Sequence, residues 1–366
     1  MSRKKVVIAG ASGLTGSAAV HHFAALADWE VVAVSRRPPL TLPVGVQHIA
    51  VDLCDAAACA HAFGTMHDVT HLIYTAVAEK LDNIFAGWTD PEQIAKNAAM
   101  LRNLFDPLAR AASSLRHVSL VHGAKAYGCH LPQLDVPVPM RESLPRVPYP
   151  NFYYEQEDYI RERQQGQDWH WTVWRPVGIA GAAVGSPMNA FLMLPLYAAL
   201  RREAGLDLPV PAGVTMATEA TDADLIAEAL EWSAEAPAAR NEIFNISNGD
   251  VVAQRERFPV VAECFGMPVG ERRRVDLASE VRAMADLWRT MVRRHELNAP
   301  EDVNALFSGS MEMSNVGVEA PDGNPLRWGL VSTIKLRHAG FNGCIDTLEM
   351  VRKYVHRYQE LRVLPR

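Results

Sequence analysis

Short apolar runs alternate with helical patterns over the first half of the chain. Continuous apolar runs of this kind are typical of strands that are buried on both faces of a sheet. Strands separated by helical segments indicate a parallel sheet built from strand–helix–strand units. We expect strands at 5–11, 29–35, 46–51, 69–75, 117–122 and 170–174, and helices at 17–26, 91–112 and from 151 onward.

The regular alternation weakens beyond about residue 180. We therefore predict an α/β fold in which residues 1–180 form a Rossmann-type, doubly wound parallel sheet with helices on both faces. Residues 181–366 are expected to form a smaller, mostly helical substrate-binding portion, with segments around 241–250 returning to the first domain. Within that portion we expect helices at 191–202, where Pro195 marks a kink or a late start, and 222–231, a strand at 242–247, and mostly helical structure beyond 255.

The composition is that of a soluble globular protein. The chain has 366 residues, 49% of them hydrophobic and 21% charged, which suffices for a large core. Its net charge of −6 argues against nucleic acid or an anionic membrane as a general partner. The longest apolar run, 190–200, is too short to span a bilayer, and a strand begins too early for a signal peptide.

Cysteine usage predicts a reduced, cytoplasmic setting. The five cysteines are scattered, odd in number and without the paired spacing of zinc sites, so neither a disulfide framework nor a metal site is expected.

A glycine-rich turn lies between the first strand and the first helix, which is the context that gives this pattern meaning. Glycines allow the backbone to approach a pyrophosphate, and the helix N-terminus supplies amide donors. An unrelated tight turn is the alternative interpretation. The expected cofactor contacts in this turn are Gly10, Ser12, Gly13, Leu14, Thr15 and Gly16.

The second strand ends in Ser35-Arg36-Arg37 instead of an acidic residue. An Asp or Glu here would bind the ribose hydroxyls, whereas arginines suit the 2′-phosphate of NADP. We therefore predict NADPH/NADP⁺ as cofactor, with a solvated basic loop as the alternative. Further cofactor contacts are expected where later strands end, at Asp52, Leu53, Thr75, Ala76, Pro176 and Ile179.

Two adjacent tyrosines, Tyr153 and Tyr154, open a helix near mid-chain. A nicotinamide enzyme needs a proton donor or oxyanion stabiliser beside its cofactor, and a tyrosine is suited to this role. The lysine that usually follows four residues later is missing, since positions 157 and 158 are acidic. Lys125 follows the fifth strand at its C-terminal end, where open parallel sheets bind ligands. A solvated surface lysine is the alternative.

These motifs resemble a known family over nearly the whole chain. The glycine turn and Arg175-Pro176 are similar to those of extended short-chain dehydrogenases/reductases. Three more particular elements are Pro150-Asn-Phe-Tyr-Tyr-x-x-Glu157-Asp158, Gly123-x-Lys125 and Asn245-Ile-Ser-Asn-Gly-Asp250. They resemble the progesterone 5β-reductase/iridoid synthase-like (PRISE) enone reductases, bacterial members included.

The resemblance implies a catalytic pair. In that family the tyrosine comes from the Asn-Phe-Tyr-Tyr motif, and a lysine is supplied from the loop after the fifth strand, which corresponds to Lys125. Tyr154 is favoured because Glu162 follows it by eight residues, which is the spacing expected in the family between the catalytic tyrosine and a recurrent helix glutamate. Tyr153 stays as the alternative. The implied activity is hydride transfer from NADPH to the β-carbon of an α,β-unsaturated carbonyl, with the tyrosine and lysine stabilising the enolate. The implied partner is a small hydrophobic carbonyl substrate.

Three other functions stay open at this point. The same groups could reduce a ketone or aldehyde to an alcohol by 1,2-addition. A sugar-nucleotide epimerase normally needs NAD and the Tyr-x-x-x-Lys pair, so the missing lysine and the arginines count against it. A non-catalytic NADP-sensing regulator would tend to lose the catalytic tyrosine, which is present here. The oligomeric state is undecided, and a homodimer is compatible with the sequence.

Overall fold

The computed structural model describes residues 3–80, 87–131, 133–187, 189–213, 216–315, 318 and 330–366. The chain divides into two compact units. The first comprises Met1–Val177, Ala223–Ile246 and Val331–Gly343, and the second comprises Gly178–Asp222, Ser247–Leu330 and Cys344–Arg366. The sequence predicts that some segments, around 241–250, return to the first domain. More of the chain returns because a helix and a strand from 223–246, and the segment 331–343, pack on the first unit.

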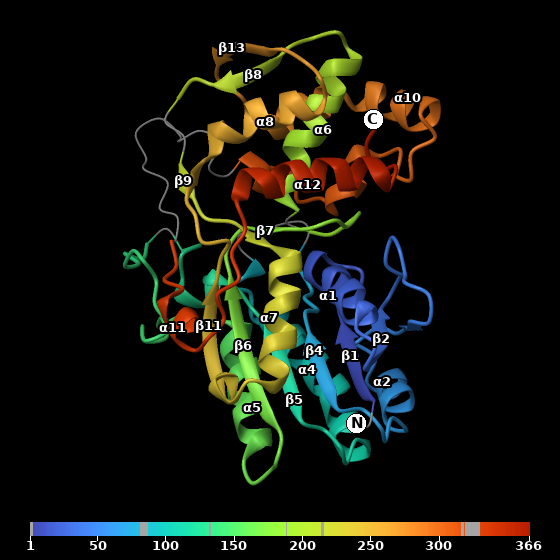
Figure 1. Ribbon diagram of the computed structural model, residues 1–366, viewed down its shortest axis with the longest axis vertical. Helices are drawn as coiled ribbons and strands as arrows, with labels where there is room; N and C mark the ends of the chain where they lie inside the picture. The colour runs from blue at the N-terminus through green and yellow to red at the C-terminus, as the bar shows by residue number, and fades with distance from the viewer. Residues whose placement is uncertain are drawn as a thin grey trace. The chain divides into compact units, whose positions relative to one another are not determined.

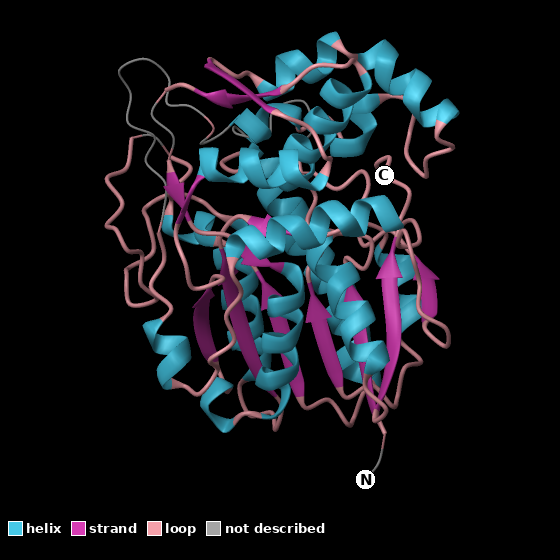
Figure 2. Cartoon of the chain, turned by 45° about the horizontal axis from the view of Figure 1, so that its top comes forward, coloured by secondary structure: helices cyan, strands magenta, loops and turns pink. Residues whose placement is uncertain are grey.

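The first unit contains the predicted parallel sheet. Its strands have the order β11-β6-β5-β4-β1-β2-β3, every neighbouring pair is parallel, and Figure 2 shows their arrows pointing the same way. The predicted doubly wound α/β fold is therefore confirmed. The strands are β1 (Lys4–Ala9), β2 (Trp29–Ser35), β3 (Gln47–Ala50), β4 (His71–Tyr74), β5 (His117–Val121), β6 (His170–Pro176) and β11 (Glu242–Ile246).

Helices cover this sheet in two groups (Figure 1). Helix α1 (Leu14–Ala25) packs against α7 (Ala223–Glu235), whereas α4 (Pro91–Ala111) packs with α2 (Ala56–Phe63) and α5 (Phe152–Gln164). Residues 6–9 of β1 are all fully buried, so both faces of the central strand are covered. Val7 and Ala9, on one face, belong to the apolar core formed with α2 and α4. The smaller elements here are η1 (Ala124–Tyr127), η2 (Pro237–Ala239) and α11 (Ile334–His338).

The second unit is mostly helical, as expected, around a core that includes the fully buried Tyr197 and Trp288. Helix α6 begins at Ala190, so Pro195 lies inside the helix and does not mark a late start. The short strand pair β8–β13 was not expected. The elements are β7 (Ile179–Ala180), α6 (Ala190–Glu203), β8 (Leu208–Pro211), β9 (Ala217–Thr218), β10 (Thr221–Asp222), β12 (Val252–Ala253), η3 (Gln254–Glu256), α8 (Arg257–Cys264), β13 (Val269–Arg273), α9 (Leu277–Ala283), α10 (Ala285–Arg294), η4 (Val303–Phe307), η5 (Met311–Asn315) and α12 (Thr347–Glu360).

No helix within the described ranges is both long enough and apolar enough to cross a bilayer.

Histidines begin three adjacent strands of the sheet. His71 on β4 pairs in register with His117 on β5, which in turn pairs with His170 on β6. Burial lowers the pKa of both His71 and His117 to about 3, and nearby cationic groups act in the same direction. The folded protein therefore holds these two rings neutral at a pH where an unfolded chain would protonate them.

This arrangement predicts acid sensitivity. Because the folded pKa values lie below the unfolded value of about 6.5, stability is lost as the pH falls from about 6.5 toward 3. Between pH 8 and pH 5.5 the two rings should remove about 3 kcal/mol from the free energy of unfolding, measured with urea. A His117→Leu variant should lose about half of that dependence, whereas the exposed His61→Leu should keep all of it. Equal pH dependence in all three proteins would contradict the assignment.

Candidate active site

The glycine turn lies where the strand order reverses between β1 and β4, the place where open α/β sheets bind ligands. Gly10 has φ +85°, and a Cβ on it would lie 2.4 Å from Thr75 Oγ1. A Cβ on Gly16 would lie 2.1 Å from Gly10 O, so neither position admits a side chain. A Cβ on Gly13 would meet Gly10 O at 3.3 Å and, beyond its chain neighbours, no other described atom within 4 Å. The backbone is therefore closely packed at Gly10 and Gly16, whereas space remains beside Gly13.

This geometry fits the pyrophosphate of a nicotinamide cofactor. Gly13 is the N-cap of α1 and, as a glycine, offers no side chain to cap this helix. The amide donors of its first turn are therefore available to an anion, and the helix dipole favours negative charge there. Ser12, Leu14 and Thr15 belong to the same turn, with Thr15 buried and the other two half-buried.

The end of β2 carries the predicted 2′-phosphate residues. Ser35 Oγ donates a hydrogen bond to Arg37 O at 2.6 Å, and His48 Nε2 lies 3.1 Å from the same Oγ. Since the hydroxyl proton is used on Arg37 O, His48 is the donor to Ser35. Arg36 and Arg37 are exposed. His48 was missed from the sequence, because nothing marks a polar residue on β3 as facing the end of β2.

Four more of the predicted cofactor residues follow strands β4 and β3. Thr75 Oγ1 donates to Ala9 O at 2.8 Å, so Thr75 and Ala76 lie against the glycine turn. A hydrogen bond from Cys54 N, at 3.0 Å, and the charge of Arg36 lower the pKa of Asp52. Leu53, which follows it, is buried.

Pro176 and Ile179 fall in different units. Pro176 ends β6 in the first unit, and its carbonyl lies 3.5 Å from the position of a Cβ on Gly123. Ile179 belongs to β7 in the second unit.

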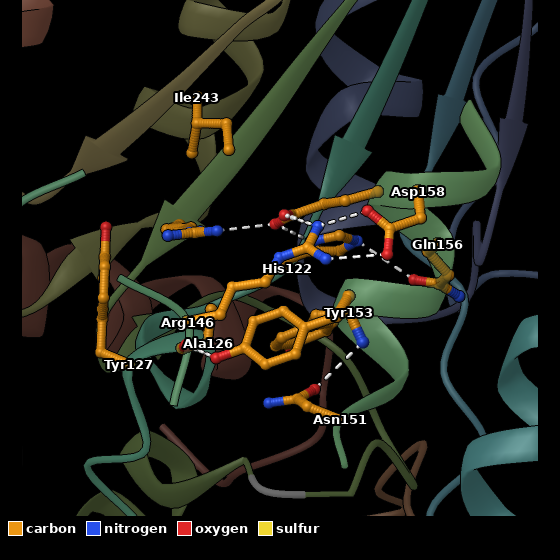
Figure 3. A network of polar contacts seen from close by, with 12 residues as sticks. His122, Ala126, Tyr127, Arg146, Asn151, Tyr153, Gln156, Asp158 and Ile243 are labelled. Carbon is orange, nitrogen blue, oxygen red and sulfur yellow. Dashed lines mark hydrogen bonds and ion pairs between the residues drawn. The ribbon is translucent and has the colours of Figure 1, made fainter. Parts of the chain in front are cut away.

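Asn151 joins the tyrosine helix to the lysine turn. As the N-cap of α5, it accepts a hydrogen bond from Tyr153 N at 3.0 Å through Oδ1 (Figure 3). Its Nδ2 donates to Lys125 O at 3.1 Å. Lys125 lies on η1, directly after β5. The structure therefore brings together the tyrosine motif and Lys125, which are separate in the sequence.

Tyr154 has a hydroxyl that is occupied by backbone. It donates to Ala126 O at 2.5 Å and accepts from Val147 N at 3.1 Å. The Arg146 guanidinium lies 4.7 Å from the centre of its ring. These contacts fix the loop around residue 147 to η1, and they leave the hydroxyl proton committed to Ala126. They do not support the preference for Tyr154 over Tyr153.

Tyr153 has the opposite environment. Its ring stacks on His122, with centroids 4.2 Å apart and planes 14° from parallel, and makes edge contacts with Trp88 and Phe152. Its hydroxyl lies 3.5 Å from the position of a Cβ on Gly123 and makes no hydrogen bond within the described ranges. Burial raises the pKa of Tyr153 well above 10, so the phenol is neutral and can donate.

Lys125 is half-buried and contacts Trp88, which also contacts the Tyr153 ring. Its Nζ lies 3.8 Å from the centre of the Trp88 ring. Burial lowers the pKa of Lys125 to about 8, although the charge of Glu79 favours the ammonium form. A lysine with this pKa is largely charged at neutral pH but close to titration.

Glu157 occupies the position four residues after Tyr153, where the ordinary motif has lysine. It accepts a hydrogen bond from Arg175 at 2.7 Å and another from Arg146 at 3.0 Å. Burial alone would raise the pKa of Glu157, but the charge and hydrogen bond of Arg175 hold it well below its usual range. His122 Nδ1 is 3.6 Å from the carboxylate, too far for a hydrogen bond. The acidic residue thus neutralises a buried arginine of β6.

His122 was not predicted as a site residue. Gln156 Nε2 donates to Asn97 O at 3.0 Å, so Gln156 Oε1 is the atom that faces His122 Nε2 at 3.1 Å (Figure 3). His122 Nε2 is therefore the donor, and burial lowers the pKa of the ring. Its place directly after β5 was the one signal in the sequence.

A cavity of about 370 Å³ adjoins Tyr154 in the first unit. Charged side chains of both signs dominate its lining, and neither Tyr153 nor Lys125 contributes to it. The cavity therefore lacks the apolar character expected of a hydrophobic carbonyl pocket. Its lining residues are Ala126, Tyr127, Glu142, Leu144, Pro145, Arg146, Tyr154, Glu157, Asp158, Arg161, Arg175 and Ile243.

Residues 6–310 match the family model of the PRISE-like Rossmann-fold domain. The chain belongs to this family. The family-level resemblance of its motifs is thereby confirmed.

Curated relatives of this PRISE-like protein agree with that assignment. It is 29% identical to the 3-oxo-Delta(4,5)-steroid 5-beta-reductase of Arabidopsis thaliana, with 98% of this chain and 92% of the relative covered. It is 31% identical to an (S)-8-oxocitronellyl enol synthase of Nepeta cataria, with 84% and 82% covered. These relatives support the prediction that the chain is an enzyme of the oxidoreductase class.

Solved structures share the fold of this PRISE-like protein. The UDP-N-acetylglucosamine 4-epimerase of Methanobrevibacter ruminantium M1 superposes with a TM-score of 0.66 at 16% identity, covering 98% of this chain and 99% of the epimerase. A short-chain dehydrogenase/reductase superfamily protein from Agrobacterium tumefaciens with bound NAD superposes with a TM-score of 0.62 at 15% identity, covering 98% of each chain. These superpositions show that the fold is shared.

Proposed function

We propose that this PRISE-like protein is an NADPH-dependent reductase of α,β-unsaturated carbonyl compounds, with Tyr153 and Lys125 as its catalytic residues. The observation that carries this proposal is the contrast between the two tyrosines. The Tyr154 hydroxyl is bonded to Ala126 O and Val147 N, whereas the Tyr153 hydroxyl makes no hydrogen bond in the described part of the chain. Tyr153 can therefore donate to a substrate oxygen.

The proposed chemistry places negative charge on that oxygen. A bound nicotinamide would supply hydride to the β-carbon of the enone, which converts the carbon–carbon double bond and carbonyl into an enolate. The neutral Tyr153 phenol donates a hydrogen bond to the enolate oxygen, and the Lys125 ammonium stabilises the charge in a site of low dielectric. Protonation of the α-carbon then completes the saturated carbonyl product.

Residues at the end of β2 support NADPH over NADH. Arg36 and Arg37 offer exposed guanidinium groups, which bind phosphate well, and no acidic side chain from Ser35 to Arg37 would repel a 2′-phosphate. The relatives include a steroid 5-beta-reductase and enol synthases, and a small hydrophobic enone fits that context. The substrate class is proposed on that basis.

A substrate panel tests the proposal. Cyclic enones, enals and matching saturated ketones would be incubated with NADPH and with NADH, and the products would be identified by mass spectrometry and NMR. We expect saturated carbonyl products, formed with NADPH in preference to NADH. Alcohols from the saturated ketones, with the enones unchanged, would replace the proposal with 1,2-carbonyl reduction by the same pair. NADPH binding without turnover of any compound would favour a cofactor-sensing role.

The pKa of Lys125 predicts an alkaline limit to the reaction. Since the charged form is the one that stabilises the enolate, kcat/KM should fall as the pH rises through about 8. Tyr153 does not set this limit, because its own pKa lies well above 10. In Lys125→Arg the residual activity should persist to higher pH, since a guanidinium stays charged. An unchanged alkaline limb in that variant would show that another group titrates.

A further inference from the structure

Trp88 contacts both of the proposed catalytic side chains. Its ring is 1% exposed, and the Lys125 ammonium lies 3.8 Å from the ring centre. The Tyr153 ring makes a T-shaped contact with it, with centroids 5.1 Å apart. We propose that Trp88 is a positioning residue that holds the Lys125 ammonium on its face and the Tyr153 ring at a fixed angle. This inference rests on the proposed roles of Lys125 and Tyr153.

The surroundings of Lys125 explain why a ring face matters there. Burial favours the neutral amine. Glu79 is the carboxylate that opposes this effect, but burial raises the pKa of Glu79 itself. Two other titratable neighbours in the described part of the chain are uncharged near neutral pH, because burial raises the pKa of Cys129 to about 11 and lowers that of His130 to about 4. The negative potential over an indole face therefore adds directly to the stabilisation of the ammonium.

The backbone around Trp88 is held in place. Gly87 runs close to two side chains, since a Cβ on it would lie 2.4 Å from Gln93 Oε1 and 2.9 Å from Lys80 Cβ. Asp90 caps α4 by accepting from Glu92 N, and it pairs with Lys80 at 2.6 Å. The indole is thus attached to the segment that precedes α4, whereas the two groups it contacts are carried by η1 and α5.

The Tyr153 side of the contact is equally restricted. Phe152 packs on Trp88 with ring centroids 4.7 Å apart, and the His122 ring stacks on Tyr153. An indole, a phenyl and an imidazole therefore surround the phenol ring, and rotation of the phenol would have to displace at least one of them. The hydroxyl is left as the part of Tyr153 that can meet a substrate.

Fluorinated tryptophans test the ammonium contact without creating a cavity. Tryptophan with one, two or three ring fluorines would be inserted at position 88 alone, since fluorine withdraws electron density from the ring face and changes its shape little. The chain has seven lysines, so the Lys125 signal can be followed by NMR on labelled lysine and assigned with Lys125→Arg. We expect the Lys125 pKa to fall stepwise, by about one pH unit over the series. The pH at which kcat/KM declines on the alkaline side should fall by the same amount.

A second set of variants tests the positioning of Tyr153. Trp88→Leu should lower kcat for enone reduction about 10- to 100-fold while the Kd for NADPH, measured by fluorescence quenching, stays within about twofold. Trp88→Phe should restore part of the rate. Trp169→Leu is the matched control, because Trp169 is also buried in the first unit but packs against Phe105. It should lose stability without moving the Lys125 pKa.

The outcomes separate the two proposals. A Lys125 pKa that does not change, or rises, across the fluorinated series would overturn the role of Trp88. Equal losses of kcat in Trp88→Leu and Trp169→Leu would also overturn it, since these losses would be general effects of lost packing. A stepwise fall in the Lys125 pKa in a protein that reduces no enone would retain the ammonium contact and reject the proposed function.

Discussion

Replacing Tyr153 with phenylalanine is expected to lower kcat for NADPH-dependent enone reduction by about 10²–10³. The change removes one hydrogen-bond donor from the oxygen on which charge develops, and donors of this kind contribute about that factor. The ring itself is retained, so stacking on His122 and the contact with Trp88 should persist. NADPH binding should stay close to that of the wild type, because the glycine turn is untouched. Steady-state kinetics and a fluorescence titration would measure the two quantities.

Tyr154→Phe provides the comparison. This variant removes the hydrogen bonds to Ala126 O and Val147 N, so we expect a loss of about 1–3 kcal/mol in the free energy of unfolding and a kcat within about tenfold of the wild type. The reverse pattern, a wild-type rate in Tyr153→Phe and a collapsed rate in Tyr154→Phe, would reinstate the choice made from the sequence. The two substituted residues are adjacent on α5. General damage to this helix would therefore lower the activity and stability of both variants alike.

Glu157→Gln is expected to destabilise the fold by about 3 kcal/mol. The side chain of Glu157 is 2% exposed and that of Arg175 is 5% exposed, and their hydrogen bond is 2.7 Å long. Neutralising the carboxylate leaves the arginine buried without its charge partner, which costs far more than the pair itself contributes. Urea denaturation at pH 7 would measure the change.

The neighbouring Asp158→Asn is the matched control. Asp158 also binds Arg146, at 2.7 Å, but its side chain is 64% exposed. Surface pairs contribute little, so we expect a loss of at most about 1 kcal/mol. A double variant that replaces Glu157 with Gln and Arg175 with Met should recover much of the stability, because the uncompensated charge is then gone. Similar losses from the two single variants would show that burial does not set the strength of the Glu157 contact.

The sheet could be predicted from the sequence because its signal is local. Val6 to Ala9 form a continuous apolar run, and the strand at Trp29–Ser35 has the predicted bounds. The β13 strand, Val269–Arg273, carries no such signal, since most of it is polar and it pairs with β8, far away in the chain. Its formation depends on a partner that periodicity does not reveal.

The site was predictable in its composition but not in its internal geometry. The motifs named Lys125 and both tyrosines, and the structure brings them together through Asn151. Which tyrosine has a committed hydroxyl depends on the backbone of Ala126 and Val147, which lies on other segments. Spacing to Glu162 carries no information about those contacts.

Asn151 gives the proposed catalytic pair a common point of attachment. One amide side chain caps α5 at Tyr153 N and holds Lys125 O on η1. A small shift of the helix along its axis would therefore carry the lysine turn in the same direction. The separation between phenol and ammonium would then vary less than the position of either group relative to the sheet.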